Sequence, residues 1–227
     1  MGQLPKYKME EAKRAKREAK LDKRRKENTR TVNIRILIVC EGQKTEPNYF
    51  KSKAKDKYSD VIDVDVEGEG RGTVSLVNKT IEIRDKSDKD YDRVWAVFDK
   101  DSFLDFNDAI KLAEKNDILC AWSNESFELW YCLHFCYLDT GVSRHQYIEI
   151  LENEIKKITN DKKYKYRKND VEMYSRLKEL GNEKQAIESA KKLKKIHTSK
   201  NYDKHNPCTM VYKLVEELNN PEKLIYK

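Results

Sequence analysis

Three acidic residues stand directly after two strongly apolar segments of the chain. Glu41 follows residues 33–40 (NIRILIVC), and Asp99 and Asp101 follow residues 93–98 (RVWAVF). Side chains two positions apart on extended backbone point the same way, so Asp99 and Asp101 could share one cation. Mg²⁺ binds through one or two carboxylates, keeps several waters and takes phosphate oxygens as further ligands. The spacing therefore predicts a site for Mg²⁺, or Mn²⁺, that faces a phosphate group.

Each of these acids also has a structural explanation when it is considered alone. Asp and Glu are common in the loops after strands, and Asp101 could simply begin a helix. Three uncompensated carboxylates in one place would repel one another and raise each other's pKa values, which a bound cation would relieve. The pattern alone leaves both interpretations open.

Hydrophobic patterning indicates a parallel sheet that would bring the three acids together. Residues 33–40 and 93–98 are expected to form buried strands, with further strands over 61–66 and 118–122. Helical spacing falls between them, over about 46–56, 73–84, 104–115 and 127–137. Alternating strands and helices predict an α/β fold with helices on both faces of the sheet. Ligands of such sheets bind beyond the carboxyl ends of the strands, where all three acids are expected.

The remaining chain is predicted to divide into an arm and a helical region. After residue 143 the strand patterns stop, and helices are expected over about 144–159, 170–180, 183–197 and 208–219. The expected organisation is a basic N-terminal arm over 1–31, helical or disordered, an α/β domain over 32–142, and a helical region over 143–227 packed on it.

The positive charge of the chain is concentrated in the arm. Residues 1–30 hold twelve Lys and Arg against five Asp and Glu, whereas the remainder holds 35 of each. The arm is either a phosphate-binding segment whose affinity falls steeply with salt or a solvated tail without a dedicated partner. Its candidate contacts to DNA or RNA are Lys13, Arg14, Arg17, Arg24 and Arg25.

Other features exclude several classes of protein. The five cysteines are scattered, without the spacing of a zinc site or a disulfide framework. No apolar run approaches the length of a membrane span, so we expect a cytoplasmic protein.

Several further residues could support the site. Lys44 could offset negative charge or bind phosphate, Glu46 and Asn124 are possible supporting groups, and Glu128 is an acid within an apolar helix. For Asn124 and Glu128 a helix-capping or packing role is the alternative, and His134 is expected to be a packing residue.

Two basic segments could also contact phosphate. Arg71 lies in the glycine-rich segment EGEGRG, which favours a flexible turn over a phosphate cradle. The segment KKYKYRK at 162–168 could bind single-stranded nucleic acid through Lys163, Lys165 and Arg167, or it could be an exposed basic loop.

Four segments of the chain resemble RloB, a Toprim-like family encoded beside restriction-modification and other phage-defence genes. They are CEGQKTEPNYF at 40–50, VWAVFDKD at 94–101, SNESFELWYCLHF at 123–135 and NPCTMVYKLVEEL at 206–218. Toprim domains of topoisomerases, primases and related nucleases pair a Glu after the first strand with a later D-x-D. Glu125 departs from the resemblance, because proline is common at that position.

The resemblance implies a Toprim/Rossmann-like fold and Mg²⁺-dependent cleavage of DNA or RNA in prokaryotic antiviral defence. Glu41 would then be the general acid/base or a metal ligand, and Asp99 and Asp101 would be the metal ligands. One alternative is a non-catalytic module whose arm grips nucleic acid and whose helical region docks a partner such as a defence ATPase. A third possibility is sensing of a nucleotide or signal molecule at the same edge.

Overall fold

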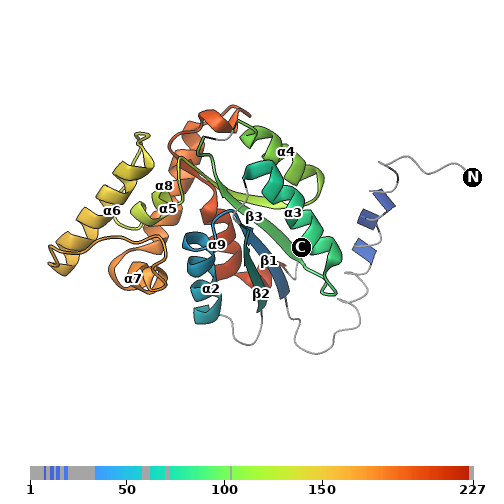
Figure 1. Cartoon of the computed structure of the whole chain (residues 1–227), viewed down its shortest axis with the longest axis horizontal. Helices are drawn as coiled ribbons and strands as arrows, with labels where there is room; N and C mark the ends of the chain where they lie inside the picture. The colour runs from blue at the N-terminus through green and yellow to red at the C-terminus, as the bar shows by residue number, and fades with distance from the viewer. Residues whose placement is uncertain are drawn as a thin grey trace, which may run out of the picture.

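A computed structural model describes residues 34–57, 62–69, 72–102 and 104–224, together with Lys8, Glu11, Ala12, Arg14, Ala15, Glu18 and Ala19. Its centre is a five-stranded sheet with the strand order β2-β1-β3-β4-β5 (Figure 1). The strands are β1 (Ile34–Cys40), β2 (Ile62–Gly68), β3 (Arg93–Asp99), β4 (Leu119–Asn124) and β5 (Cys208–Thr209). The first four are parallel, and β5 is antiparallel to β4. The carboxyl ends of β1, β3 and β4 therefore lie at one edge of the sheet.

Helices cover both faces of the sheet (Figure 1). Four helices lie over its two faces: α2 (Thr45–Lys57), α3 (Thr73–Lys86), α4 (Phe106–Lys115) and α9 (Val211–Asn219). On one face α3 and α4 pack against each other and against β3 and β4, while α2 and α9 lie on the opposite face with β2 and β4. This arrangement follows from right-handed crossovers that run in opposite directions from β1.

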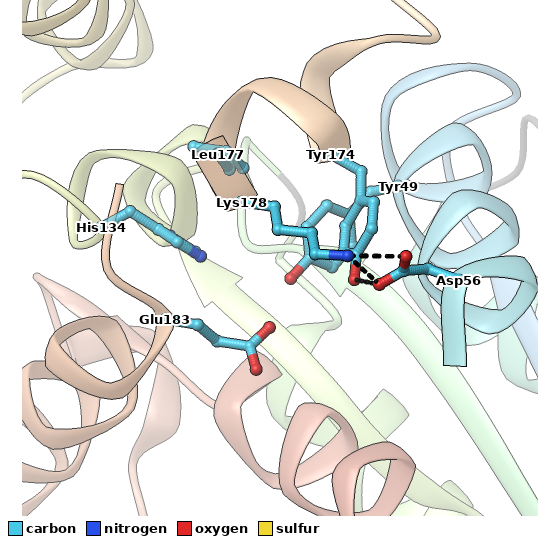
Figure 2. A pocket seen from close by; sticks show the side chains of 7 residues that line it. All are labelled: Tyr49, Asp56, His134, Tyr174, Leu177, Lys178 and Glu183. Carbon is cyan, nitrogen blue, oxygen red and sulfur yellow. Dashed lines mark hydrogen bonds and ion pairs between the residues drawn. The ribbon is translucent and has the colours of Figure 1, made fainter. Parts of the chain in front are cut away.

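The helical region lies against the α2 and α9 face. It contains α6 (Arg144–Thr159), α7 (Met173–Leu180) and α8 (Glu183–Ile196), with short 3₁₀ helices η1 (Tyr202–Lys204) and η2 (Pro221–Leu224). The short helix α5 (Glu128–Cys132) precedes this region in the chain and packs against α6 and α8. Asp56 of α2 accepts hydrogen bonds from the Tyr174 hydroxyl at 3.0 Å and from Lys178 at 2.7 Å, both on α7 (Figure 2). Polar contacts therefore hold the helical region to the α/β unit.

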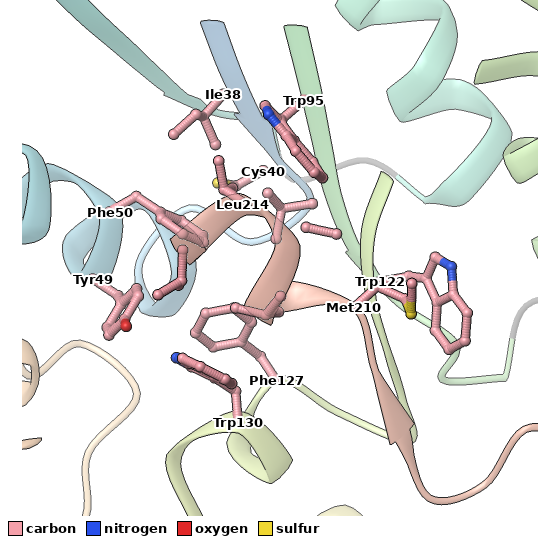
Figure 3. Packing of buried hydrophobic residues seen from close by; sticks show 14 of the residues in the cluster. Ile38, Cys40, Tyr49, Phe50, Trp95, Trp122, Phe127, Trp130, Met210 and Leu214 are labelled. Atoms are coloured by element: carbon pink, nitrogen blue, oxygen red, sulfur yellow. The ribbon is translucent and has the colours of Figure 1, made fainter. Parts of the chain in front are cut away.

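One apolar core joins the sheet to this helical layer. Every residue of β1 except Arg35 is buried, as expected for a strand between two layers of helices. Ile38 and Cys40 point toward Phe50 of α2 and Leu214 of α9, with Phe127 and Trp130 below them (Figure 3). The site at the end of β1 thus rests on a packed and rigid base.

The structure confirms the predicted fold class, an α/β sheet flanked by helices and followed by a helical region. The expectation that strands stop after residue 143 was wrong, because Cys208 and Thr209 pair with Asn124 and Ser123. A two-residue strand is too short to produce a readable alternation, and the predicted helix over 208–219 included it. The segment after residue 143 therefore supplies β5 and α9 to the central sheet and its core. Among the described residues, no helix is long and apolar enough to cross a membrane.

Candidate functional site

The acidic residues predicted from the sequence line a cavity of about 270 Å³ at the carboxyl edge of the sheet. Five carboxylate side chains and three basic side chains contribute to its wall. The lining residues are Glu41, Gly42, Gln43, Lys44, Thr45, Glu46, Asp99, Asp101, Phe127, Glu128, Arg144 and Lys168. The cavity thus combines groups from the ends of β1 and β3 with groups from the helical region.

Glu41 and Asp99 are joined directly. The backbone N–H of Glu41 donates to the Val97 carbonyl at 2.8 Å, which continues the pairing of β1 with β3 by one residue. The Glu41 carboxylate then turns toward β3 and accepts the backbone N–H of Asp99 at 3.1 Å. Sheet pairing therefore fixes these two acids side by side, as the strand-end argument predicted.

Asp101 joins them for a different reason from the one expected. Its backbone is not extended, because its φ angle is 40°, in the left-handed region that Asp tolerates better than most residues. Asp99 and Asp101 do lie close together, but the predicted cause, the alternation of side chains along a strand, was wrong. A turn, rather than the pleat of a strand, brings the Asp101 carboxylate toward that of Asp99.

Arg144 bridges the two aspartates. Its guanidinium donates to Asp99 Oδ2 at 3.1 Å and to Asp101 Oδ2 at 3.3 Å. Arg144 is the first residue of α6, after the Ser143 N-cap, which forms a capping box with Gln146. The sequence prediction missed this residue. The available signal was its position, since the first turn of a helix favours acidic rather than basic side chains.

Two further acids lie deeper in the cavity. Glu46 and Glu128 are both buried, and Glu128 Oε1 accepts a hydrogen bond from the Tyr166 hydroxyl at 3.2 Å. Tyr166 belongs to the segment 160–170, named here the strap loop. The Lys168 carbonyl of this loop accepts the Thr45 hydroxyl at 2.9 Å, which holds the loop against the start of α2.

The five carboxylates of the cavity outnumber its three basic side chains, and this raises the pKa values of some of the acids. Burial, together with the charges of Glu46 and Asp101, raises the pKa of Glu41 to about 7, although the hydrogen bond from Asp99 acts in the opposite direction. Burial and the charges of Glu46 and Glu128 raise the pKa of Asp99, and Arg144 offsets only part of this effect. The site therefore has more negative charge than its own cations balance.

One buried oxygen of the site lacks a partner. Asp99 Oδ1 is buried and accepts no hydrogen bond within the described part of the chain. A carboxylate oxygen in this state is costly unless a donor or a cation is supplied. An unpartnered oxygen among several carboxylates matches the donor chemistry of Mg²⁺ or Mn²⁺.

The carboxylate oxygens of the cavity are suitable ligands for Mg²⁺ or Mn²⁺, but Arg144 would have to move before Asp99 and Asp101 could both hold the ion. Over the ranges that the structure covers, no three His, Cys, Asp or Glu side chains are grouped to hold a metal ion as they stand. Arg144 supplies the positive charge between Asp99 and Asp101 instead. An ion held by both aspartates would require that guanidinium to move.

Three residues near the site have structural contacts. Asn124 donates to the Asp203 carbonyl at 3.0 Å and does not line the cavity. Glu125 accepts the backbone N–H of Arg144 at 3.4 Å, at the beginning of α6. His134 is buried and pairs through Nδ1 with the Trp130 carbonyl at 2.9 Å, which agrees with the expected packing role.

The strap loop turns its tyrosines inward and its cations outward. Tyr166 packs against Tyr131, and Tyr164 lies beneath the Arg176 guanidinium at 5.0 Å, so these rings are not free to stack on bases. Lys163 and Arg167 are exposed, and Lys165 pairs with Glu152 at 2.9 Å.

The other predicted basic contacts are described only in part. Arg71, Lys13, Arg17, Arg24 and Arg25 lie outside the described residues. Arg14 is described, and it pairs with Asp117 at 3.2 Å.

Two hydrogen-bond donors at the N-terminus of α3 are already bonded to a carboxylate. The Asp105 carboxylate accepts the Thr73 hydroxyl and the backbone N–H of Val74, so it already occupies the N-terminus of α3. Gly70 and Arg71 lie outside the described residues, so the turn interpretation of the glycine-rich segment stays a prediction.

Comparison with known proteins gives one match. The model of the family described as RloB-like protein matches residues 36–218, which include all five acids of the cavity and Arg144. No curated protein and no solved structure matches the chain. The matched region begins within β1 and ends within α9, so it includes strands β2 to β5 and helices α2 to α8 in full. The chain belongs to the RloB-like protein family.

Proposed function

We propose that this protein is a Mg²⁺-dependent nuclease that cleaves phosphodiester bonds of DNA or RNA in prokaryotic antiviral defence. The observation that carries the proposal is the meeting of Glu41 with Asp99 at the carboxyl edge of the sheet, where one buried oxygen of Asp99 has no partner within the described residues. The resemblance of the two strand-end motifs to Toprim nucleases supplies the reaction class.

Each residue of the cavity has a defined role in this proposal. Asp99 and Asp101 would hold the divalent ion. A bound Mg²⁺ would polarise the phosphate and offset the charge that develops on its oxygens. Glu41, held in place by the Asp99 N–H, would exchange a proton with the attacking or leaving oxygen. Lys44 and Lys168 would attract the phosphate to the mouth of the cavity.

The test is cleavage by the Asp99→Asn variant. Full-length protein is incubated with DNA and with total RNA, with and without Mg²⁺ or Mn²⁺. The asparagine keeps the size of the side chain but removes its charge, so cleavage should fall on the order of 10²-fold or more. The matched control is Asp108→Asn, which removes an exposed carboxylate from α4, away from the cavity. Cleavage by Asp99→Asn at the wild-type rate would refute the mechanism.

A second function is favoured by the ion pairs of Arg144. Because this residue already forms ion pairs with Asp99 and Asp101, the site could serve a protein that binds nucleic acid or docks a defence ATPase without cleavage. This alternative predicts salt-sensitive binding that survives Asp99→Asn, together with no metal-dependent cleavage by the wild type.

A further inference from the structure

Arg144 occupies the space between Asp99 and Asp101, where an ion held by both aspartates would have to bind. Its two terminal nitrogens lie 3.1 Å from Asp99 Oδ2 and 3.3 Å from Asp101 Oδ2. A divalent cation that bridges the two carboxylates would lie at the position of the guanidinium, and the positive charges of the two groups repel at such short range. If the proposed function holds, binding of the ion must therefore displace the Arg144 side chain.

The structure leaves the guanidinium able to move while its backbone stays fixed. The backbone of Arg144 is held by the Ser143 capping box and by the bond from its own N–H to Glu125. The side chain is 30% exposed, and its Nε is buried without a partner in the described part of the chain. The head group is thus only partly satisfied and lies at the boundary between the acids and solvent.

A substrate phosphate would offer the displaced guanidinium a better partner. The planar fork of Arg binds two phosphate oxygens at once, which makes phosphate a preferred ligand of this side chain. The cavity wall also carries Lys44 and Lys168, so a phosphate entering there meets positive charge from two segments of the chain. The released Arg144 would need only side-chain rotation to join them.

We propose that Arg144 exchanges partners at this site. In the resting protein it is the counter-ion of Asp99 and Asp101, and when a divalent cation binds it transfers to the phosphate of a phosphodiester substrate. The inference rests on the proposed function. Its consequence is coupling: the cation alone binds weakly because it must displace Arg144, and the phosphate strengthens cation binding by accepting the guanidinium. By linkage, the cation strengthens phosphate binding by the same factor.

The experiment is a Mn²⁺ titration followed by the electron paramagnetic resonance signal of the free ion. Full-length wild type and Arg144→Gln are compared, with and without a short phosphorothioate oligonucleotide that resists cleavage. Without the oligonucleotide, Arg144→Gln should bind Mn²⁺ on the order of 10-fold more tightly than wild type. The oligonucleotide should strengthen Mn²⁺ binding about 5- to 150-fold in the wild type and much less in the variant.

Two further variants guard against misfolding and unspecific charge effects. Arg144→Lys keeps the charge but loses the fork, so its Mn²⁺ affinity without the oligonucleotide should lie between those of wild type and Arg144→Gln. Arg176→Gln removes a half-buried cation that rests on the Tyr164 ring outside the cavity, and it should behave as wild type. Thermal melting of each variant establishes that it is folded.

The outcomes separate this inference from the proposed function. Equal Mn²⁺ affinity in wild type and Arg144→Gln, lost in Asp99→Asn, would overturn the exchange while leaving the metal site intact. If neither the wild type nor any of the variants binds Mn²⁺, both the exchange of Arg144 and the proposed metal-dependent function are overturned. Tighter binding by Arg144→Gln, with weakened coupling to the oligonucleotide, is the result that supports the exchange.

Discussion

Asp99 and Glu183 are both acidic, yet the structure gives them opposite surroundings. Burial and the neighbouring acids Glu46 and Glu128 raise the pKa of Asp99. Burial acts in the same direction on Glu183, but Lys53 and Asn219 outweigh it and lower the pKa of Glu183. Glu183 therefore has its counter-charge built into the fold. Asp99 shares one arginine with Asp101, and one of its oxygens has no partner among the described residues, which marks it as the candidate for function.

His134 predicts a pH dependence of stability. Burial lowers its pKa to about 4 from the ordinary 6.5, although the bond to the Trp130 carbonyl and the charge of Glu183 act in the opposite direction, while Lys53 adds to the lowering. Between about pH 6.5 and pH 4, His134 is therefore protonated in the unfolded chain but neutral in the native protein. The contribution of His134 to stability is complete above pH 6.5 and falls by roughly 3 kcal/mol as the pH drops toward 4.

The measurement compares wild type with His134→Asn in urea denaturation at pH 7.5 and pH 4.5. Asn keeps a donor near the Trp130 carbonyl but does not titrate. The free energy of unfolding should therefore fall less on acidification in the variant than in wild type. Groups that do not interact with His134 titrate alike in both proteins and cancel in the difference. The same acid sensitivity in both proteins would contradict this interpretation.

At the scale of elements, Lys53 ties α2 to the helices of the C-terminal half. It is fully buried and donates to Glu183 at 2.7 Å and to Asn219 at 2.9 Å, which belong to α8 and α9. Removing one partner of a buried ion pair leaves the other charge uncompensated and costs about 3–5 kcal/mol. We therefore expect Lys53→Met to lower the free energy of unfolding by that amount.

Denaturant unfolding of three variants separates the buried charge from lost packing. Lys51→Met changes an exposed lysine on the same helix and should unfold as wild type does. Lys53→Met with Glu183→Leu removes both charges and should recover part of the loss. If Lys53→Met stays within 1 kcal/mol of wild type, the pair does not hold these elements together.

The sequence predicts the strands that carry Glu41 and Asp99, but it does not predict Arg144 and the strap loop, which complete the site. The strands β1 and β3 are runs of apolar residues, so their positions, and with them Glu41 and Asp99, could be read directly. Arg144 contacts Asp99 across 45 positions of sequence, and the strap loop reaches Thr45 across 123. Such contacts are set by how the helical region folds back over the sheet. Local periodicity contains no information about that packing.

At the scale of the whole molecule, Arg14, one of the described residues of the arm, and the acids are found at opposite edges of the sheet. Arg14 pairs with Asp117, which lies just before β4, whereas the acids follow the ends of β1 and β3. The strands β1 to β3 each have seven residues, so the two edges are roughly 20 Å apart. A polynucleotide that contacts both must extend along the body, which places the arm in binding rather than in chemistry.

Deleting residues 1–30 should therefore weaken binding and leave the chemistry unchanged. The deletion removes twelve Lys and Arg and only five acids, while the rest of the chain holds 35 of each, so little net charge remains to attract phosphate. Affinity for DNA or RNA should fall, and the slope of log affinity against log salt should become shallower by several units, because fewer counterions are released. Fluorescence anisotropy with a labelled oligonucleotide between 50 and 200 mM salt measures both the affinity and its salt dependence. The cleavage rate at saturating substrate should stay at the wild-type value.

Replacing Lys13, Arg17, Arg24 and Arg25 by Gln is the matched variant, since it removes charge but keeps the length of the arm. A salt slope unchanged in both variants would show that the basic arm has no part in nucleic-acid binding, and a fall in the saturated rate would show that it acts in the chemistry itself.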